Sequence, residues 1–444
     1  MAAPELHYIP PLGPTADPPI ASVPPDVLGY ILNFVYQKSD GDKNKRPNSP
    51  IVFSHVCRFW RSIALDNSLW WTRIIVTPLW NLDEVGTFLD RSKECPLDLR
   101  IFVNVDPTTA EHVIHPTFLD NYQHFRNLVS PHIHRCRIFY LQAYFNKTTQ
   151  FLVPYLLESF RRLDMPYLEQ FIVNGRLELE EISPQQSLFS SAPFLRELRI
   201  GGHGLSNYLL PLSGVTKLHL TMRRPSTGIP PVRLNAVFNE CISLTELALY
   251  DNVLDLAGFS LRPLFVFPSL ITLHLLEDMA LVSEFLILIS SAPKLHKLVL
   301  VPVSEVDLQL LARSTTRPHF PSLTSLVLSP MNKRSWAATA HASTCFPDIT
   351  RLTLHNVYHD AYSGYFLEIT APLFPCLLHL ALKGFNEALS SVINDFVIFR
   401  RSQKVPLKSV FVDEALIQYL LRYSQLWGDT KVLGVDQIGD DDPC

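Results

Sequence analysis

A short pattern of apolar positions recurs along most of the chain. In PSLITLHL (268–275) and PKLHKLVL (293–300), one apolar residue is followed by others three and five residues later. Successive units lie about 27 residues apart, a period at which a chain builds a repeat array. The first apolar positions of the eleven units are Ile133, Leu168, Leu195, Val215, Leu244, Leu270, Leu295, Leu323, Ile349, Leu377 and Leu407.

This spacing predicts a short strand in each unit. The second and third apolar residues are two positions apart, so both point from a strand into a core, while the first fills that core from the preceding turn. One strand cannot bury this face alone, but stacked parallel strands can, with helices on the other side. Segments 235–243 and 281–293 have the helix-like pattern that this outer layer needs.

We therefore predict an α/β fold in which 97–434 form an irregular leucine-rich-repeat solenoid, with parallel strands inside and helices outside. The consensus of such repeats places Asn or Cys three positions after the last Leu. Asn252 is the only clear match here, and for this reason we expect irregular repeats without an even curvature.

The front of the chain follows a different pattern. Residues 1–20 are rich in proline and predict an extended, poorly ordered arm. The stretch VPPDVLGYILNFVYQ (23–37) predicts a helix that begins at its prolines. The apolar face of this helix holds Val27, Leu28, Ile31, Leu32 and Val35.

A polar loop is expected at 38–50, followed by a second helix that DNSLWW (66–71) ends, because Asn and Ser favour turns. We expect a helical unit at 21–76, a connecting segment at 77–96 and an acidic tail at 435–444. The apolar stripe of the second helix comprises Phe53, Val56, Cys57, Trp60, Ile63 and Ala64.

Together, VPPDVLGYILNFV (23–35) and FSHVCRFWRSIALDNSLWWTRI (53–74) resemble the F-box of fungal F-box-like proteins. The family pattern runs Leu-Pro-x-Glu-hydrophobic-Leu-x-x-Ile, then Val-Cys-x-x-Trp-x-x-Ile-Ala, then Leu-Trp, and here Val23 stands in place of the first Leu. RSKECPLDLRI (91–101) also looks like the segment that follows in fungal members. Leucine-rich repeats are a familiar partner module of F-boxes.

The resemblance implies a substrate-recognition subunit of a Skp-cullin-F-box ubiquitin ligase, not an enzyme in itself. The F-box would dock on a Skp-type adaptor of the cullin ligase, and the repeats would bind an unknown protein substrate. The adaptor-binding residues that it implies are Pro24, Pro25, Val27, Leu28, Ile31, Leu32, Val56, Cys57, Trp60, Leu69 and Trp70.

Two alternatives stay open at this point. Trp60, Trp70 and Trp71 could simply form the core of the helical unit, since buried aromatic residues are ordinary core, and we expect that unit to serve partly as core and partly as a docking face. The chain could also be a leucine-rich-repeat interaction scaffold that recruits no ligase.

A substrate surface is expected on the concave side of the strands, where residues alternate with the core positions. The middle of this surface is apolar and its flanks carry Arg, Lys and His, the anatomy of a protein interface, and the basic residues would suit an acidic or phosphorylated segment. The candidate residues are Arg199, His219, Tyr250, His274, Val299, Arg351, His355 and Lys383.

Composition narrows the remaining classes. Charged residues make up 18% of the chain and the net charge is −4, so nucleic acid is not an expected partner. Seven scattered cysteines without a C-x-x-C pair are typical of a reducing compartment. The start lacks the features of a secretory signal, and the apolar run near 281–293 is too short to span a membrane. We expect a soluble protein of the cytoplasm, the nucleus or both, without a membrane partner.

No sequence motif of a nucleotide-binding loop, nucleophile elbow or zinc protease is present. The run His132-Ile133-His134-Arg135-Cys136 holds ligand-type residues, but Cys136 is expected in the core, so the three cannot converge on a metal. We expect no catalytic residue, metal or cofactor.

Overall fold

The computed structural model divides the chain into two compact units, Met1–Gln142 (unit 1) and Ala143–Cys444 (unit 2). The predicted arm at 1–20, Asn252 and the acidic residues 436–444 lie outside the described residues. The structure describes residues 23–38, 49–77, 81–103, 116–143, 157–174, 186–201, 208–222, 228–251, 253–256, 259, 262–276, 282–314, 320–330, 335–355, 373–385, 387 and 390–435.

Unit 1 begins with three helices, α1 (Pro25–Lys38), α2 (Ser49–Val56) and α3 (Arg58–Asp66), and a 3-10 turn, η3 (Ser68–Trp71). The helix predicted at 23–37 is confirmed as α1. The prediction of one second helix is wrong, because the chain breaks into α2 and α3 at Cys57. Cys57 has extended backbone, and its Sγ accepts a hydrogen bond from the Trp60 amide at 3.5 Å, which caps α3.

The rest of unit 1 alternates strands and helices. These elements are β1 (Arg73–Val76), α4 (Leu82–Arg91), β2 (Leu97–Val103), α5 (Pro116–Val129), the 3-10 helix η4 (Ser130–Arg135) and β3 (Cys136–Ala143). Strands β1 and β2 are parallel, with Arg73 opposite Asp98. The strand-helix alternation thus begins inside unit 1, so the limits predicted at 76 and 96 do not coincide with the division between the units.

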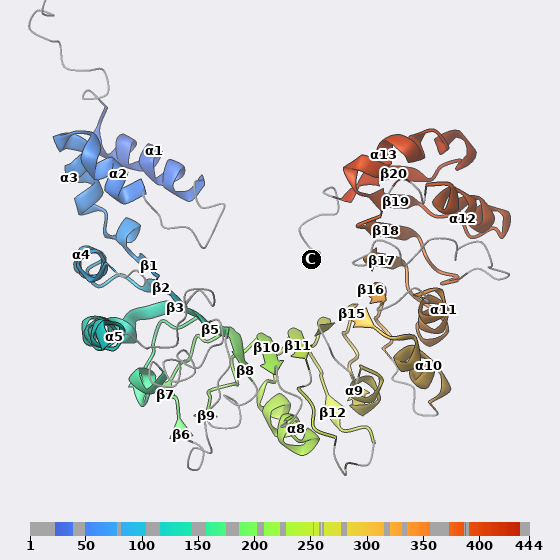
Figure 1. Ribbon diagram of the computed structural model, residues 1–444, viewed down its shortest axis with the longest axis horizontal. Helices are drawn as coiled ribbons and strands as arrows, with labels where there is room; N and C mark the ends of the chain where they lie inside the picture. The colour runs from blue at the N-terminus through green and yellow to red at the C-terminus, as the bar shows by residue number, and fades with distance from the viewer. Residues whose placement is uncertain are drawn as a thin grey trace, which may run out of the picture. The chain divides into compact units, whose positions relative to one another are not determined.

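Unit 2 contains one long parallel sheet, coloured green to red in Figure 1. Each strand pairs in parallel with the strand of the next unit along the chain, so neighbouring strands come from successive copies of the same unit. In spatial order the strands are β5 (Gln170–Asn174), β8 (Glu197–Gly201), β10 (Lys217–Met222), β11 (Glu246–Asp251), β13 (Thr272–Leu276), β15 (Lys297–Val303), β16 (Ser325–Pro330), β17 (Arg351–His355), β18 (His379–Lys383), β19 (Ser409–Val412) and β20 (Lys431–Gly434).

Helices of unit 2 lie on one side of this sheet and leave the other side, here called the open face, without helices among the described residues (Figure 1). They are α8 (Pro231–Glu240), α9 (Val282–Leu288), α10 (Glu305–Arg313), α11 (Ser335–Cys345), α12 (Ser390–Ser402) and α13 (Glu414–Leu421). Short paired strands accompany them: β4 (Leu163–Asp164) with β7 (Phe189–Ser191), β6 (Gln186–Ser187) with β9 (Tyr208–Leu209), and β12 (Phe265–Val266) with β14 (Ile289–Ser291). The described part of the unit also contains two 3-10 turns, η5 (Glu158–Phe160) and η8 (Ser424–Leu426).

The predicted core positions are confirmed throughout unit 2. In each of the ten units from Leu168 onward, all three apolar positions are buried; Leu270, Leu273 and Leu275 are examples. The α/β class with stacked parallel strands is therefore confirmed. Burial of three apolar side chains in each unit contributes about 1.5–3 kcal/mol per side chain, and the strands share one continuous core.

The unit predicted at Ile133 is wrong in one position. Ile138 is only half-buried, whereas Phe139 and Leu141 are buried with Cys136. The same spacing therefore starts at Cys136. The reason is that residues 130–135 form a 3-10 helix, which delays the strand by about one turn.

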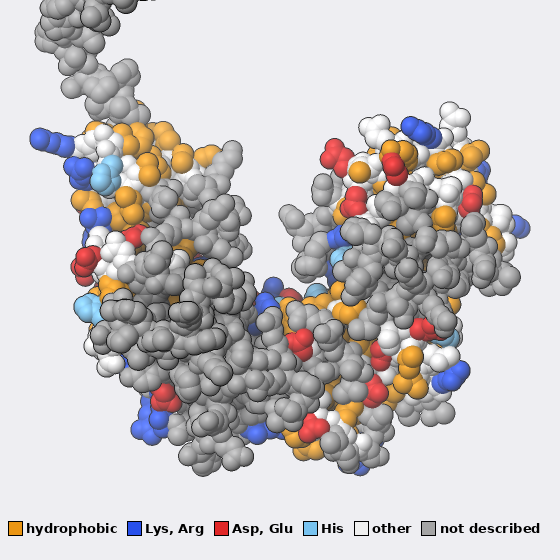
Figure 2. Space-filling model, viewed as in Figure 1, with side chains coloured by type: hydrophobic (Ala, Val, Ile, Leu, Met, Phe, Trp, Pro, Cys, Tyr) orange, Lys and Arg blue, Asp and Glu red, His pale blue; other side chains and the backbone are white. Residues whose placement is uncertain are grey.

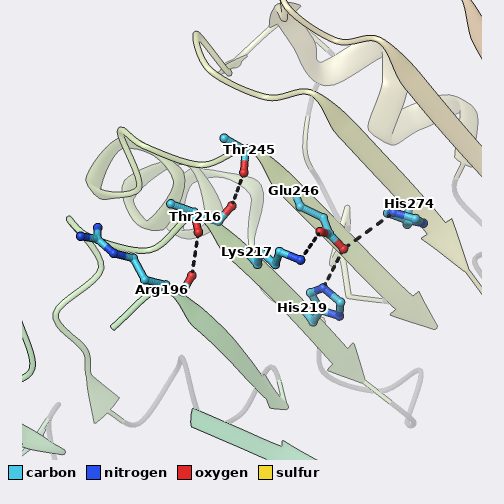
Figure 3. Close-up of polar contacts among 7 residues, drawn as sticks. All are labelled: Arg196, Thr216, Lys217, His219, Thr245, Glu246 and His274. Atoms are coloured by element: carbon cyan, nitrogen blue, oxygen red, sulfur yellow. Dashed lines mark hydrogen bonds and ion pairs between the residues drawn. The ribbon is translucent and has the colours of Figure 1, made fainter. Parts of the chain in front are cut away.

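A repeated hydrogen-bond arrangement joins successive units at the start of each strand. One carbonyl of the preceding unit accepts from two successive amides, as when the Thr216 carbonyl accepts from Thr245 at 2.8 Å and from Glu246 at 3.0 Å. The Thr245 hydroxyl donates to the same carbonyl at 3.1 Å (Figure 3). These bonds fix the register, which decides which side chains meet on the open face.

Two buried arginines tie helices to turns, one in each unit. In unit 1, Arg135 donates to the Cys95 carbonyl at 2.6 Å and to the Ser92 hydroxyl at 3.0 Å. In unit 2, Arg400 of α12 is fully buried and donates to the carbonyls of the turn before β18. Neither role was predicted, because a lone arginine in a sequence carries no sign of its burial.

Candidate functional sites

The parallel register arranges the side chains of the open face in rows across the strands. One row runs Arg199, His219, Ala248, His274 and Val299 from β8 to β15. On either side of it, Lys217, Glu246 and Lys297 belong to an earlier row, and Tyr250, Leu276 and Val301 to a later one. Residues 27 or so apart in sequence therefore become direct neighbours, about 4.8 Å apart.

These rows enclose a pocket of about 270 Å³ in unit 2. Its floor is apolar, and the polar side chains surround the floor. The apolar lining consists of Ala248, Leu276, Val299, Val301 and Val327, with Tyr250 beside them. The polar lining consists of His219, Glu246, His274, Lys297, Thr353, His355 and Lys383.

Glu246 organises the polar side of the pocket (Figure 3). The Lys217 ammonium lies 3.3 Å from Glu246 Oε2, and His219 Nε2 donates to Glu246 Oε1 at 3.2 Å. The hydrogen bond from His219, together with the charge of nearby Lys217 and against the opposing effect of burial, lowers the pKa of Glu246 to about 2. The carboxylate is therefore ionised at neutral pH and already engaged by two donors.

His274 lies next to this group, on β13. It is 8% exposed, and its Nε2 is 3.9 Å from Glu246 Oε1, beyond hydrogen-bond distance. This nitrogen is buried and has no hydrogen-bond partner in the structure. Burial lowers the pKa of His274 to about 4, so the ring is neutral at pH 7.

The pocket brings together six of the eight predicted substrate residues, namely His219, Tyr250, His274, Val299, His355 and Lys383. Arg199 lies beside it, with its guanidinium carbon 4.8 Å from the centre of the Tyr250 ring. Arg351 is exposed and does not line the pocket. Burial, and then the charge of Lys383, lowers the pKa of His355.

Thr353 is a lining residue that was not among the eight candidates from the sequence. It occupies the same alternating position on β17 as His274 on β13, so the repeat spacing contains the signal that identifies it. Val299, His274, Thr353 and Lys297 are each nearly buried, so polar side chains as well as apolar ones reach the bottom of the pocket.

The pH dependence of stability should identify His274. Its pKa is about 4 in the folded chain against about 6.5 in the unfolded one, so acidification protonates the unfolded state first and stability falls as pH drops from 6.5 to 4. We expect His274→Leu to reduce the loss of unfolding free energy between pH 7 and pH 4.5 by about 1–3 kcal/mol. Urea titrations at the two pH values measure it, and an unchanged difference would contradict the assignment.

A second candidate site is an apolar surface on the helices of unit 1. Tyr30 is 77% exposed and Phe34 is 60% exposed, and Val27, Ile31 and Val35 of the same helix are exposed with them. These five residues, the α1 apolar face, follow the i, i+3, i+4, i+7 spacing of one side of a helix. Figure 2 shows hydrophobic side chains gathered over this part of the chain.

The other side of α1 is buried. Leu28 and Leu32 are 1% and 2% exposed. The helix thus carries two apolar sides, only one of which the fold covers. On α2 and η3, Val52, Val56 and Leu69 are also exposed.

Several predicted adaptor residues are corrected by their burial. Leu28, Leu32 and Trp70 lie inside the unit and offer no surface to a partner. Trp70 donates from Nε1 to Asn33 Oδ1 at 3.2 Å, and its ring lies 5.5 Å from that of Phe53 in an edge contact. Of the remaining candidates, Trp60 is half-buried, and Pro24, Pro25, Val27, Ile31, Val56, Cys57 and Leu69 are exposed.

Sequence reasoning missed Tyr30 and Phe34, which are the most exposed aromatic residues of α1. Their signal was present in the sequence, since they fall three and seven positions after Val27 and complete its stripe. Comparison with protein-family models and with curated proteins finds no match to this chain.

Among the described residues, no group of three His, Cys, Asp or Glu side chains is arranged to hold a metal ion. At His132–Cys136, the Arg135 guanidinium lies 3.3 Å from His132 Nδ1, and burial raises the pKa of Cys136 to about 12. That thiol is protonated at neutral pH and is a poor metal ligand. The described helices include none with the length and apolar character of a membrane span.

Proposed function

We propose that this chain is a substrate receptor of a Skp-cullin-F-box ubiquitin ligase. In this proposal the helices of unit 1 are an F-box that docks on a Skp-type adaptor, and unit 2 is a leucine-rich-repeat domain that holds a substrate protein. The chain itself has a binding role, and ubiquitin transfer belongs to other subunits of the ligase.

The observation that carries the proposal is the α1 apolar face. Five large apolar side chains on one side of a 14-residue helix are exposed, although the unit has an interior of its own. Contiguous exposed apolar surface of this kind marks interaction sites on globular proteins. Aromatic residues such as Tyr30 and Phe34 are enriched among the residues that carry most of the binding energy in an interface.

The resemblance of the sequence to F-boxes supplies the choice of partner. Of the residues that match the family pattern, Pro25, Val27 and Ile31 are exposed on α1 and belong to or border its apolar face. Val56 and Leu69 match the pattern as well and are exposed on the following elements. Val27, Ile31, Val56 and Leu69 therefore both match the family pattern and are exposed apolar side chains.

The repeat period of about 27 residues supports leucine-rich repeats for unit 2. Its open face combines an apolar floor with a polar rim, which is the composition of a protein interface. A cytoplasmic or nuclear location is part of the same proposal, because the ligase acts there.

Binding of a Skp-type adaptor tests the docking surface. We expect the full chain to bind a purified fungal Skp-type adaptor. We expect the double variant Tyr30→Ser, Phe34→Ser to bind it at least ~100-fold more weakly, because loss of two aromatic anchors that the adaptor would cover costs about 3 kcal/mol. Biolayer interferometry with the adaptor immobilised measures both affinities.

The matched control is Tyr167→Ser, Phe194→Ser, which makes the same replacements at two exposed positions of unit 2. We expect this control to bind as the unchanged chain does. Equal binding by the Tyr30, Phe34 double variant would remove the α1 apolar face from the interface. If the unchanged chain binds no adaptor, the scaffold alternative, a repeat protein without a ligase, takes its place.

A further inference from the structure

We propose that the open face of unit 2 binds an extended peptide of about nine residues with aliphatic side chains at its centre and carboxylates toward both ends. The proposal rests on the proposed function in taking unit 2 as the substrate-binding part, and it names the chemistry of that substrate. It uses the pocket between β10 and β18 and no residue of unit 1.

The size and floor of the pocket favour side chains of a peptide as its occupants. Its volume of about 270 Å³ is below the ~300–1,000 Å³ of typical pockets for drug-sized ligands. Leu276, Val299, Val301 and Val327 form an aliphatic floor on three neighbouring strands. Aliphatic side chains that enter the pocket would remove apolar surface of both the peptide and the pocket from water. This stabilises the complex by about 25 cal/mol per Å² of apolar surface buried.

The charged side chains around the floor favour negatively charged residues at the ends of the peptide. Lys217 and Lys383 lie at the two ends of the run of strands from β10 to β18, and Lys297 lies on β15, beside the floor. Glu246 is the one acidic side chain among the described lining residues, and Lys217 and His219 already engage it. A ligand that carries negative charge is therefore complementary to this rim.

His274 adds a site for the peptide backbone. Its Nε2 is buried and has no hydrogen-bond partner, and the ring is neutral at pH 7. A buried polar atom without a partner costs about 1–3 kcal/mol, so a ligand that pairs with it gains that energy. A peptide backbone offers both a donor and an acceptor in each residue, and either tautomer of His274 can be satisfied.

The spacing of the strands sets the length. From β10 to β18 the strand order is β10, β11, β13, β15, β16, β17, β18, which spans about 29 Å at ~4.8 Å per strand. An extended peptide covers this span with about nine residues at ~3.3 Å each. The floor from β11 to β16 takes about four of them, which leaves about one or two residues toward Lys217 on β10 and about three toward Lys383 on β18.

Other ligand classes fit the pocket less well. A divalent cation at Glu246 and the two histidines would lie against Lys217, whose ammonium is 3.3 Å from the same carboxylate, and would be repelled. Nucleic acid requires clustered Lys or Arg along its phosphates, whereas the centre of this site is aliphatic.

Fluorescein-labelled nine-residue peptides test the proposal with the full chain and no adaptor. One peptide has the order acidic, aliphatic, acidic; the second replaces its acidic residues with lysine; the third replaces its aliphatic residues with serine. We expect the first to bind at least ~10-fold more tightly than either of the others by fluorescence anisotropy. Equal affinity for the three peptides, or no binding of the first, would overturn the proposal.

A charge swap separates recognition from a folding defect. We expect Lys383→Glu to bind the acidic peptide at least ~10-fold more weakly and a peptide with lysines at one end more tightly than the unchanged chain does, a gain that a misfolded variant would not show. Lys294→Glu, at an exposed turn before β15, is the matched control and should change neither affinity. Identical behaviour of the two variants would show that the pocket is not the site. Peptide binding by a chain that binds no adaptor would overturn the proposed function alone.

Discussion

Trp71→Ala is expected to destabilise unit 1 by about 3–5 kcal/mol, the usual loss when a fully buried tryptophan is truncated. The Trp71 ring is completely buried, lies 5.0 Å from that of Phe88 in an edge contact and has the Arg91 guanidinium carbon 4.4 Å from its centre. Its Nε1 donates to the Ala64 carbonyl at 2.7 Å, near the end of α3. The variant therefore loses the packing between η3 and α4 and the hydrogen bond from the indole to the Ala64 carbonyl of α3.

Hydrogen exchange measured by mass spectrometry on peptides from 58–103 would give this loss, because exchange reports the stability of each segment separately. Leu69→Ala is the control: Leu69 belongs to the same 3-10 turn and is 63% exposed. We expect that variant to change stability by less than ~0.5 kcal/mol. Similar protection in Trp71→Ala and Leu69→Ala would show that Trp71 is not part of the core.

Arg400→Met is expected to destabilise the C-terminal part of unit 2 by about 3–5 kcal/mol. The guanidinium donates to the carbonyls of Leu373 at 2.6 Å, Phe374 at 3.3 Å and Leu377 at 3.1 Å. Methionine has nearly the same length but no donors. The Phe374 carbonyl keeps its hydrogen bond from the Leu377 amide, but the Leu373 and Leu377 carbonyls lose the one from Arg400, and a buried carbonyl left without a partner costs about 1–3 kcal/mol. Burial lowers the pKa of Arg400 to about 10, so the side chain is charged at neutral pH and donates through all of these bonds.

Arg401→Met is the matched control, since Arg401 is the next residue of α12, is exposed and donates to the single carbonyl of Leu426 at 2.9 Å. We expect it to cost less than ~1 kcal/mol. Hydrogen exchange over 373–430 distinguishes the two variants, and an equal loss of protection would rule out a special role for Arg400. Arg400→Lys should recover little of the loss, because one ammonium cannot reproduce the fork of donors.

The candidate site on the open face was largely predictable from the sequence. Positions such as His274, Val299 and Lys383 alternate with core leucines, and a strand sends alternate side chains to opposite faces. Once the period was recognised, the neighbours across the strands followed from it. The hydrogen bond from His219 to Glu246 did not follow, because it depends on the rotamers of two side chains 27 residues apart.

The docking candidates of unit 1 were less predictable. Leu28 and Ile31 both belong to an apolar stretch of one helix, and only the position of the neighbouring elements decides that Leu28 is buried and Ile31 exposed. The same holds for two adjacent residues of η3: Trp70 is fully buried, whereas Leu69 is largely exposed. An apolar residue favours burial, but the sequence does not show which element of the fold or which partner buries it.

The sequence by itself determined the α/β repeat, the core positions of unit 2 and the helix α1, because each follows from local spacing that repeats along the chain. Only the tertiary structure decided the break at Cys57, the buried side of α1, the burial of Arg400 and the group around Glu246. Except for the break at Cys57, which a local cap accompanies, each of these depends on contacts between segments far apart in sequence. Whether a side chain is core or surface is settled by the neighbours that reach it, and those neighbours are set by how the elements pack.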